Sequence, residues 1–362
     1  MRVVIAPDSF KGSISNFECA SAIAEGWLSV RPADQVLLKP MADGGEGTLD
    51  TIAASNPAAL RINLKEASTS EWLLLVDGTA VVELANICGI TLLPELDPMG
   101  SNTFALGVAL KEVARDSRVK RAIVAVGGSA STDGGVGALI ALGANILNMY
   151  GELVPLGGKG LNQISRIDVS DVIKPPIGGV TCLVDVKNTL LGTDGCARIF
   201  SPQKGASPTQ VQELEAGLVN LLQRSEAKDF PGAGAAGGTP FGLSMGWSIS
   251  LKSGAQIISE LIGLPEVIRE ADLVITGEGR LDSQSFNGKV VSEVKKIASK
   301  FETPIFYCVG SHAVSELSEG IANRVISLVD IAPSLEDAIS DPGIWLREAG
   351  GIIARKYPKW LG

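Results

Sequence analysis

Residues 121–142 read RAIVAVGGSASTDGGVGALIAL, and this stretch decides the fold class. Its first six residues form an apolar run typical of a buried strand, and residues 137–142 are typical of a helix. Glycine, serine, threonine and aspartate fill the loop between them. A strand, a small-residue loop and a helix form the repeating unit of an α/β sheet. We therefore expect an α/β protein with largely parallel sheets flanked by helices.

The same alternation recurs on both sides of this stretch. Ser15 and Glu18 form a capping-box pattern that predicts a helix start, and Ser207 followed by Pro208 predicts another. An apolar stripe from residue 290 to residue 301 predicts a further helix. Further strands are expected at residues 2–6, 180–186, 272–276, 304–309 and 324–329. Because 362 residues exceed what one hydrophobic core usually serves, two domains are expected.

The composition excludes several classes of function. The chain has 31 basic and 40 acidic residues, a formal charge of −9 and no block of basic residues, so nucleic-acid binding is not expected. No apolar run reaches the roughly 20 residues of a membrane-spanning helix. Five cysteines without a C-x-x-C pattern indicate reduced, mostly buried thiols in a cytoplasmic protein. The single histidine, His312, disfavours a zinc site and a serine–histidine triad.

Polar clusters stand where strands are expected to end, and the first two precede helices. Residues 7–13, PDSFKGS, offer Asp8 and Lys11 before a helix N-terminus, which favours an anion; ordinary capping is the alternative. Residues 42–48, ADGGEGT, place Asp43 and Glu46 among three glycines. Acids on such a bare backbone can hold a divalent metal or a substrate hydroxyl. The alternative is a glycine turn whose acid complements a helix dipole.

The third cluster is the loop of the opening stretch, residues 127–135, GGSASTDGG. Its small residues suit a loop in which successive N–H groups cradle phosphates. It does not match G-x-x-x-x-G-K-[ST] and is no ordinary P-loop. Residues 232–237, GAGAAG, do match G-x-G-x-x-G, but Pro231 precedes them instead of a strand. That segment is expected to be a mobile flap over the site or a plain surface loop.

The fourth and fifth clusters lie further along the chain. Asp185 ends an expected strand, a frequent place for a metal ligand, and Lys204 is expected to be an exposed cation in a proline–glycine loop. Either could instead be an ordinary surface turn residue. The fifth cluster, TGEGRLD at residues 276–282, is expected as a loop in which Arg280 could grip a carboxylate or phosphate. Lys289 stands at the next helix start.

Together and in this order, these segments resemble the type-1 glycerate kinase family. The segments are PDSFKGS, ADGGEGT, GGSASTDGG, DVKNTLLG to PQKGA, GAGAAGGTPFG and TGEGRLDSQSFNGK. The resemblance implies transfer of a phosphoryl group from ATP to D-glycerate with Mg²⁺, and 2-phosphoglycerate as the product of bacterial members. It also implies two α/β domains, with the site in the cleft between them. We expect an outer Rossmann-like domain at residues 1–75 and 290–362 and an inserted domain at residues 76–289.

The roles assigned to the residues follow the needs of phosphoryl transfer, which are positioning and charge neutralisation. The candidate catalytic residues are Asp43, Asp133, Asp185, Arg280 and Lys289. The candidate substrate-binding residues are Asp8, Lys11, Glu46, Lys204 and Glu278. The candidate nucleotide-binding residues are Gly127, Gly128, Ser129, Gly234 and Gly237. Asp43 and Asp185 are the candidate Mg²⁺ ligands, and Asp133 is the candidate general base.

Three alternatives remain open from the residues alone. The same kinase could give 3-phosphoglycerate. The G-x-G-x-x-G match could belong to an NAD-dependent oxidoreductase acting on a hydroxy acid. A non-catalytic sensor of a sugar acid is the third alternative, although five polar clusters exceed what a sensor needs. The oligomeric state is not predicted.

Overall fold

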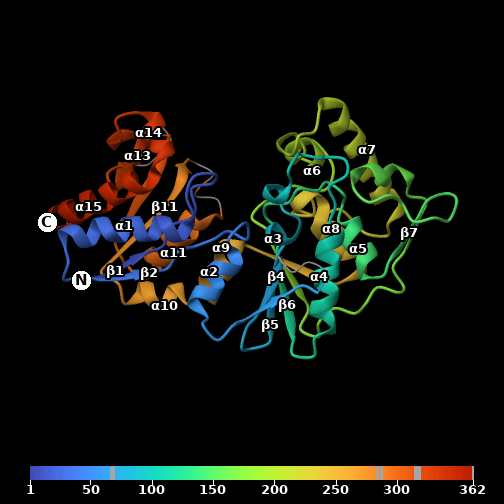
Figure 1. The fold of residues 1–362 in the computed structure, drawn as a ribbon, viewed down its shortest axis with the longest axis horizontal. Helices are drawn as coiled ribbons and strands as arrows, with labels where there is room; N and C mark the ends of the chain where they lie inside the picture. The colour runs from blue at the N-terminus through green and yellow to red at the C-terminus, as the bar shows by residue number, and fades with distance from the viewer. Residues whose placement is uncertain (66–69, 283–284, 286–287, 314–318, 361–362) are drawn as a thin grey trace. The chain divides into compact units, whose positions relative to one another are not determined.

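Two mainly parallel sheets organise the chain, and each has its own helices and core (Figure 1). The computed structural model describes residues 1–65, 70–282, 285, 288–313 and 319–360. Two compact units result: unit 1 holds residues 1–43, 50–55 and 253–362, and unit 2 holds residues 44–49 and 56–252. The α/β class expected from the sequence is confirmed. The predicted domain limits stay a prediction, and they differ from the limits of these units.

Unit 1 contains a five-stranded sheet in the order β13-β12-β11-β1-β2, in which every pair is parallel. Its elements are β1 (Arg2–Ile5), α1 (Asn16–Val30), β2 (Gln35–Leu38), α9 (Gly254–Leu261), α10 (Leu264–Arg269), β11 (Leu273–Leu281), α11 (Val290–Lys300), β12 (Ile305–His312), α12 (Glu319–Ala322), β13 (Val325–Ser327), α13 (Leu328–Ile331), α14 (Leu335–Ser340) and α15 (Pro342–Trp360). Helix α2 (Thr48–Ser55) begins in unit 2 and ends in unit 1.

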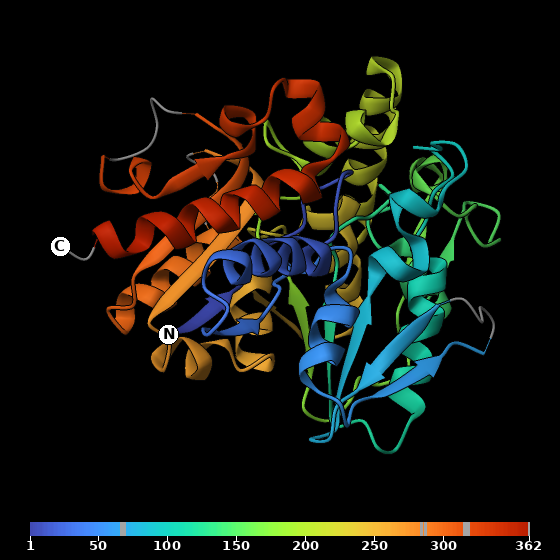
Figure 2. The ribbon, with the colours of Figure 1, turned by 60° about the vertical axis from the view of Figure 1, so that its left-hand side comes forward.

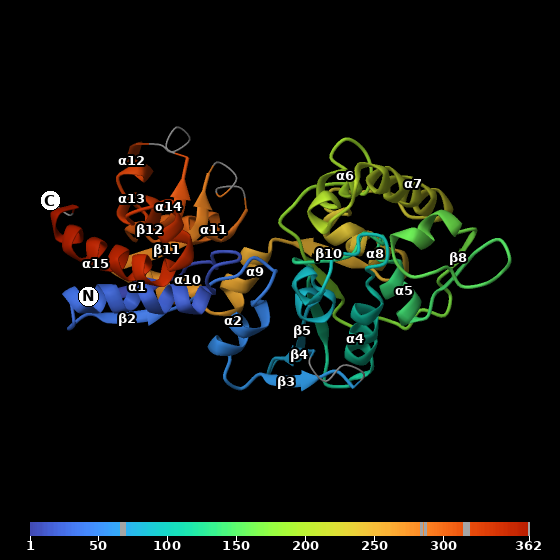
Figure 3. The same ribbon diagram turned by 45° about the horizontal axis from the view of Figure 1, so that its top comes forward.

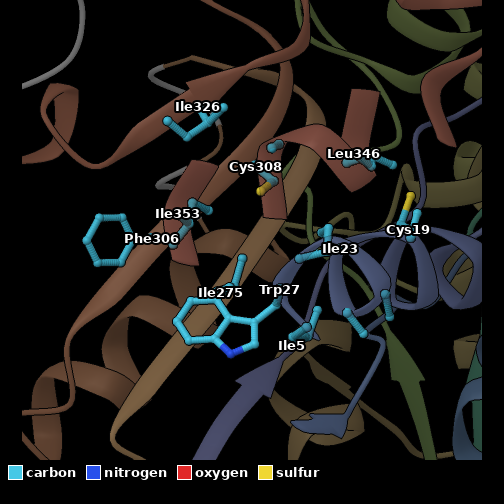
Figure 4. Packing of buried hydrophobic residues seen from close by; sticks show 14 of the residues in the cluster. Ile5, Cys19, Ile23, Trp27, Ile275, Phe306, Cys308, Ile326, Leu346 and Ile353 are labelled. Atoms are coloured by element: carbon cyan, nitrogen blue, oxygen red, sulfur yellow. The ribbon is translucent and has the colours of Figure 1, made fainter. Parts of the chain in front are cut away.

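One face of this sheet is covered by α1 and α15, which lie side by side (Figure 2). Ile5, Ile23, Trp27 and Ile275 are fully buried in the core that these elements share (Figure 4). A Cβ on Gly26 of α1 would lie 1.8 Å from the carbonyl oxygen of Arg347 in α15, so the absence of side chains here lets the two helices approach closely. The first and last long helices of the chain therefore close one face of unit 1 together.

Unit 2 contains a six-stranded sheet in the order β10-β9-β6-β5-β4-β3 and a small hairpin, β7-β8 (Figure 3). The pairs from β10 to β5 are parallel, and β4 and β3 add an antiparallel edge. Its elements are β3 (Leu60–Asn63), β4 (Glu71–Leu74), β5 (Thr79–Glu83), α3 (Leu84–Cys88), η1 (Ile90–Leu92), α4 (Phe104–Arg115), β6 (Arg121–Ala125), α5 (Val136–Leu142), β7 (Asn145–Leu147), η2 (Gly158–Gln163), β8 (Arg166–Asp168), β9 (Val180–Leu183), α6 (Cys196–Phe200), η3 (Pro202–Lys204), α7 (Pro208–Arg224), η4 (Ala235–Gly238), α8 (Thr239–Gly246) and β10 (Ile249–Lys252).

The two predicted helix starts are confirmed in atomic detail. Ser15 accepts a hydrogen bond from the backbone N–H of Glu18, whose carboxylate accepts one from the Ser15 backbone N–H in return. Ser207 and Gln210 form the same reciprocal pair at the start of α7. Such a pair satisfies two of the N–H groups that a helix N-terminus leaves open.

Strand β11 is longer than its apolar sequence suggested, which corrects one expectation. Residues 276–282 were expected to form a loop, yet β11 continues to Leu281. The reason is its parallel pairing with β12, in which Glu278 lies opposite Val309 and Arg280 opposite Ser311. Residues 283–284 and 286–287 of the same motif lie outside the described residues.

All five cysteines are free thiols; Cys88 is half-buried, and the other four, Cys19, Cys182, Cys196 and Cys308, are buried. Burial raises the pKa of Cys19, Cys88, Cys182 and Cys196 to about 12, so these groups are neutral thiols at ordinary pH. His312 is the last residue of β12, and its Nε2 lies 3.3 Å from a carboxylate oxygen of Asp330. Among the helices that the structure describes, none combines the length and apolar character needed to cross a bilayer.

Candidate functional site

Unit 1 gathers three carboxylates near the carboxyl ends of its strands. Asp8 follows β1, and its backbone N–H donates a hydrogen bond of 2.9 Å to the carbonyl of Gly277 in β11. Glu278 is the next residue of that strand, and Asp43 lies on the segment that leaves β2. Electrostatic repulsion links Asp8 to both Asp43 and Glu278, which shows that the three groups are neighbours. In open parallel sheets this edge is where ligands bind.

The proton affinities of this cluster are strongly perturbed. Burial, followed by repulsion from Asp43, raises the pKa of Asp8 to about 8. Burial also raises the pKa of Glu278, against the opposing effects of a hydrogen bond from Ser285 and the charge of Lys289. One oxygen of Glu278, Oε1, is buried without a hydrogen-bond partner among the described residues. Perturbed carboxyl groups at a sheet edge are typical of functional sites.

Cations accompany these acids in unit 1. The Nζ atom of Lys11, whose side chain is 79% exposed, lies 3.6 Å from a carboxylate oxygen of Asp43. Lys289 immediately precedes α11, and its charge lowers the pKa of Glu278. The guanidinium Nε of Arg280 lies 3.8 Å from Asp282, and the Arg280 side chain is exposed. The first, second and fifth clusters therefore contribute neighbouring charged groups within unit 1.

In unit 2 the backbones of the second cluster (residues 42–48) and the third cluster (residues 127–135) contact each other. The N–H of Gly127 donates a 2.9 Å hydrogen bond to the carbonyl of Gly44. A Cβ on Gly127 would lie 2.7 Å from the Cα of Gly45, so this approach requires glycine. Gly128 lies beside the side chain of Glu46, which accepts a hydrogen bond from Thr91 at 3.2 Å. The sequence places these segments far apart, and the sheet brings them together.

The register of the sheet in unit 2 aligns further candidates. Ala125 of β6 pairs with Leu183 of β9 and with Glu83 of β5. Gly127 and Asp185 therefore follow their strands by the same two residues, at the same edge. Ser129, two residues further, is buried, and its hydroxyl accepts a hydrogen bond from the N–H of Ser131.

The sequence analysis missed Glu83, a buried acid that holds this edge in place. Its two carboxylate oxygens accept hydrogen bonds from the backbone N–H groups of Gly47 and Leu49, at 3.2 and 2.9 Å. Glu83 thereby fixes the glycine turn of residues 44–49 against β5. The sequence does contain a clue: Glu83 is the last residue of the run TAVVE, and an acid directly after buried apolar residues of a strand is unusual.

Asp133 has a different environment from the one expected of a general base. It is fully buried, and its carboxylate accepts hydrogen bonds from the N–H and hydroxyl of Thr103 and from the N–H groups of Gly135 and Gly137. These four bonds tie the third cluster to the starts of α4 and α5. Both carboxylate oxygens are taken up by these donors and the side chain has no exposed surface, which disfavours direct contact with a substrate hydroxyl.

Lys204 is not the exposed cation that its proline–glycine loop suggested. Only 4% of the residue is exposed, and its Nζ donates a hydrogen bond to the carbonyl of Ser131 in the third cluster. Burial lowers the pKa of Lys204 to about 8. The expectation was wrong because η3 turns the side chain inward, which residue type alone does not reveal.

The glycine-rich segment 232–238 is not a surface loop, because all of its residues except Ala236 are buried. Gly234 and Gly237 are buried, and η4 follows no strand, so a dinucleotide-binding turn is absent from this described segment. A Cβ on Gly237 would lie 2.0 Å from the carbonyl of Ser131, and one on Gly234 would lie 2.2 Å from that of Thr189. These glycines pack the segment against the third and fourth clusters.

Metal ligands were expected at Asp43 and Asp185. Within the described residues, no group of three or more histidine, cysteine or acidic side chains is arranged to hold a metal ion by itself. Mg²⁺, however, commonly binds through one or two carboxylates together with water and phosphate oxygens. Asp43, beside the perturbed Asp8, offers a hard oxygen donor of that kind.

Parallel α/β sheets whose carboxyl edges carry glycine-rich loops and clustered acids define a class of proteins that bind phosphorylated ligands at that edge. A model of the glycerate kinase family matches residues 3–357 of this chain. The chain belongs to the glycerate kinase family.

Relatives and a solved structure agree with this assignment. The glycerate 2-kinase of Escherichia coli K12 is 39% identical over 328 residues, covering 86% of this chain and 85% of its own. The glycerate kinase of Bacillus subtilis 168 is 35% identical, covering 98% of this chain and 97% of its own. A crystal structure of a protein designated glycerate kinase 2 from Salmonella typhimurium LT2 has a TM-score of 0.78 and 31% identity, covering 100% of this chain and 99% of that one. The resemblance seen in the sequence is confirmed.

Proposed function

We propose that this protein is an ATP-dependent kinase that phosphorylates D-glycerate and gives 2-phospho-D-glycerate. The observation that carries the proposal is the family match over residues 3–357, which includes every motif segment. The 2-phosphorylated product is supported by the Escherichia coli relative, which is named glycerate 2-kinase. The single histidine of the chain suffices for this chemistry, because phosphoryl transfer depends on positioning and charge neutralisation and does not require a histidine. A cytoplasmic location is part of the proposal.

We assign the nucleotide phosphates to the glycine-rich edge of unit 2. Gly127, Gly128 and Ser129 follow β6, where bare backbone allows phosphate oxygens to approach N–H groups closely. The Gly44–Gly127 hydrogen bond and the hydrogen bonds to Glu83 join this loop to the neighbouring glycine turn and to β5. Gly234 and Gly237 support this edge through backbone packing; their direct contact with nucleotide stays a prediction.

Charged groups within each unit are the candidates for binding the substrate and the metal. Asp8 and Glu278 are proposed to accept hydrogen bonds from glycerate hydroxyls, and Glu46 is proposed to do the same in unit 2. Lys11, Arg280 and Lys289 are proposed to bind its carboxylate or the transferred phosphate, since cations favour both. Asp43 and Asp185 would hold Mg²⁺, which supplies charge neutralisation of the phosphates when bound. Asp133 as general base stays a prediction that its four hydrogen bonds disfavour.

The decisive experiment is phosphorus NMR of the product formed from D-glycerate, ATP and Mg²⁺. We expect 2-phosphoglycerate together with ADP. A 3-phosphoglycerate signal would overturn the regiochemistry while retaining the kinase. Binding of D-glycerate without ADP release would indicate the sensor, and a thermal shift with NAD but none with ATP–Mg²⁺ would indicate the oxidoreductase.

A further inference from the structure

Lys204 is a lysine whose side chain is buried in the protein interior. Its ammonium group is buried in unit 2, where its hydrogen bond goes to the backbone carbonyl of Ser131. The titratable groups that influence it are Cys196, Asp133 and Cys88. Burial raises the pKa of both thiols to about 12, so the two cysteines are neutral at ordinary pH, and Asp133 is the one carboxyl group among the three.

Burying this ammonium group costs stability. The pKa of Lys204 falls from 10.5 to about 8 because burial penalises the charged form more than Asp133 favours it. Below pH 8 the folded protein holds a charged group that an unfolded chain would solvate more favourably. An apolar side chain of similar length would avoid this penalty, as replacements of buried charges often do.

The segment that Lys204 contacts is fixed from several directions. Asp133 ties it to Thr103 at the start of α4, and the N–H of Gly134 donates to the carbonyl of Gly237 at 2.9 Å. The N–H of Gly127 is bonded to Gly44 at its other end. Residue 131, in the middle of the segment, receives the Lys204 ammonium group at its carbonyl oxygen.

We propose that Lys204 is a positioning residue for the nucleotide: its ammonium group holds the Ser131 carbonyl, and thereby sets the backbone of residues 127–133 in the conformation that receives the phosphates of ATP. This inference rests on the proposed function and replaces the direct substrate contact expected from the sequence. Lys204 acts through the loop and does not touch glycerate.

The test is Lys204→Met, compared with Lys204→Gln, in the full-length protein. Met fills similar volume without charge, and the amide of Gln can still donate to the Ser131 carbonyl. We expect Lys204→Met to melt at the wild-type temperature or above it at pH 7. Its KM for ATP should rise about tenfold, while its KM for D-glycerate changes less than about threefold. Lys204→Gln should recover part of the ATP affinity, and it also serves if the Met variant fails to fold.

The pH profile gives a readout that a purely structural role would not move. As the pH rises through about 8, Lys204 loses its proton, so its charge-assisted bond to Ser131 weakens. The wild-type KM for ATP should therefore increase above pH 8. Both variants should lack this increase, since neither side chain titrates.

Lys39→Met is the matched control. Lys39 is half-buried, burial lowers its pKa as well, and its Nζ donates to the carbonyl of Ile262 at 2.8 Å within unit 1. This variant should leave both KM values unchanged. Hydrogen exchange of residues 127–135 supplies a readout without turnover: exchange should be faster in Lys204→Met than in wild type.

Several outcomes would overturn the inference. A KM for ATP equal to that of the wild type in both Lys204 variants would overturn it. A rise confined to the KM for D-glycerate would also overturn it, because that result indicates direct contact between Lys204 and the substrate. Unchanged exchange of residues 127–135 would also contradict it. Failure of the proposed function is separate, because it would appear as no ADP release by the wild-type protein.

Discussion

Asp8 has a pKa far above that of an ordinary aspartate. Its pKa of about 8, against 3.8 for an ordinary aspartate, means that the folded protein binds a proton between these pH values that the unfolded chain does not. Stability of the metal-free protein should therefore fall as the pH rises from about 4 to about 8, and then level off. The direction follows from burial first and from the Asp43 charge second.

Asp8→Asn should remove most of this dependence, because an amide has no charge to bury. Melting temperatures measured in EDTA from pH 5 to pH 9 should decline less in the variant than in the wild type, with the variant more stable at pH 8. Asp43 and Glu278 are present in both proteins, so the difference reports the titration of Asp8 together with its repulsion of these two neighbours. Parallel declines would show that Asp8 is ionised normally.

Asp43 and Arg280 carry the activity prediction. Asp43→Asn and Arg280→Ala should each lower kcat/KM by about 100-fold, or about 2.7 kcal/mol, if these groups stabilise the transferred phosphoryl group. Steady-state kinetics with ATP–Mg²⁺ and D-glycerate measure this. Arg198→Ala is the control, because Arg198 forms an exposed ion pair with Glu215 that should contribute little. A loss below about threefold would remove either residue from the site.

At the scale of elements, the glycine-rich segment before α8 packs closely against the loop that contains Ser131. Gly237 has a φ of +68° and no space for a Cβ beside the Ser131 carbonyl. Gly237→Ala should therefore lower the free energy of unfolding by about 3 kcal/mol, from steric overlap and backbone strain. Urea denaturation at constant m-value measures the loss.

Gly151→Ala is the matched control for this substitution. Gly151 has a φ of +80° but open space around its Cα, so only the backbone strain of about 1 kcal/mol should remain. Equal effects of the two substitutions would show that the segment can move aside, as a flap would.

Local patterns in the sequence predicted where helices and strands begin. They did not predict how these elements pair or which side chains become buried. The capping boxes at Ser15 and Ser207 depend on residues three apart, so they could be identified directly. The extension of β11 depends on pairing with β12, and the burial of Lys204 depends on how η3 turns. Such features arise from distant parts of the chain, and residue types alone gave the opposite expectation.

The candidate site shows the same division. The motif segments identified the family because their order along the chain is itself a sequence property. That Gly44 contacts Gly127, and that Glu83 supports the glycine turn, follows from strand order and register. Neither is encoded in local periodicity, so the sequence analysis named Gly127 for phosphate and missed Glu83.

At the scale of the whole molecule, the limits of the two units predict which fragments of the chain can fold on their own. A fragment of residues 44–252 retains all six strands of the unit 2 sheet, including β3 and β4 with the buried Trp72. The fragment 76–289, drawn at the limits expected from the sequence, lacks β3 and β4 and carries β11 without β1 and β12. The first should unfold cooperatively and the second should not.

Circular dichroism during urea unfolding, together with the near-ultraviolet signal of tryptophan, distinguishes these fragments. Cooperative unfolding of 76–289 at the same midpoint as 44–252 would favour the limits drawn from the sequence. Absence of cooperativity in both would show that unit 2 requires the rest of the chain.

The pairing of α1 with α15 has a consequence for how the protein is made. At 5–20 residues per second, roughly 15 to 50 s pass between synthesis of β1 and of its partner β11, and α15 appears later still. Until then, β1, α1 and β2 lack the strand and helix that cover them in the folded protein. These elements are exposed to chaperones and proteases during that interval, while residues 56–252 can already assemble their own sheet.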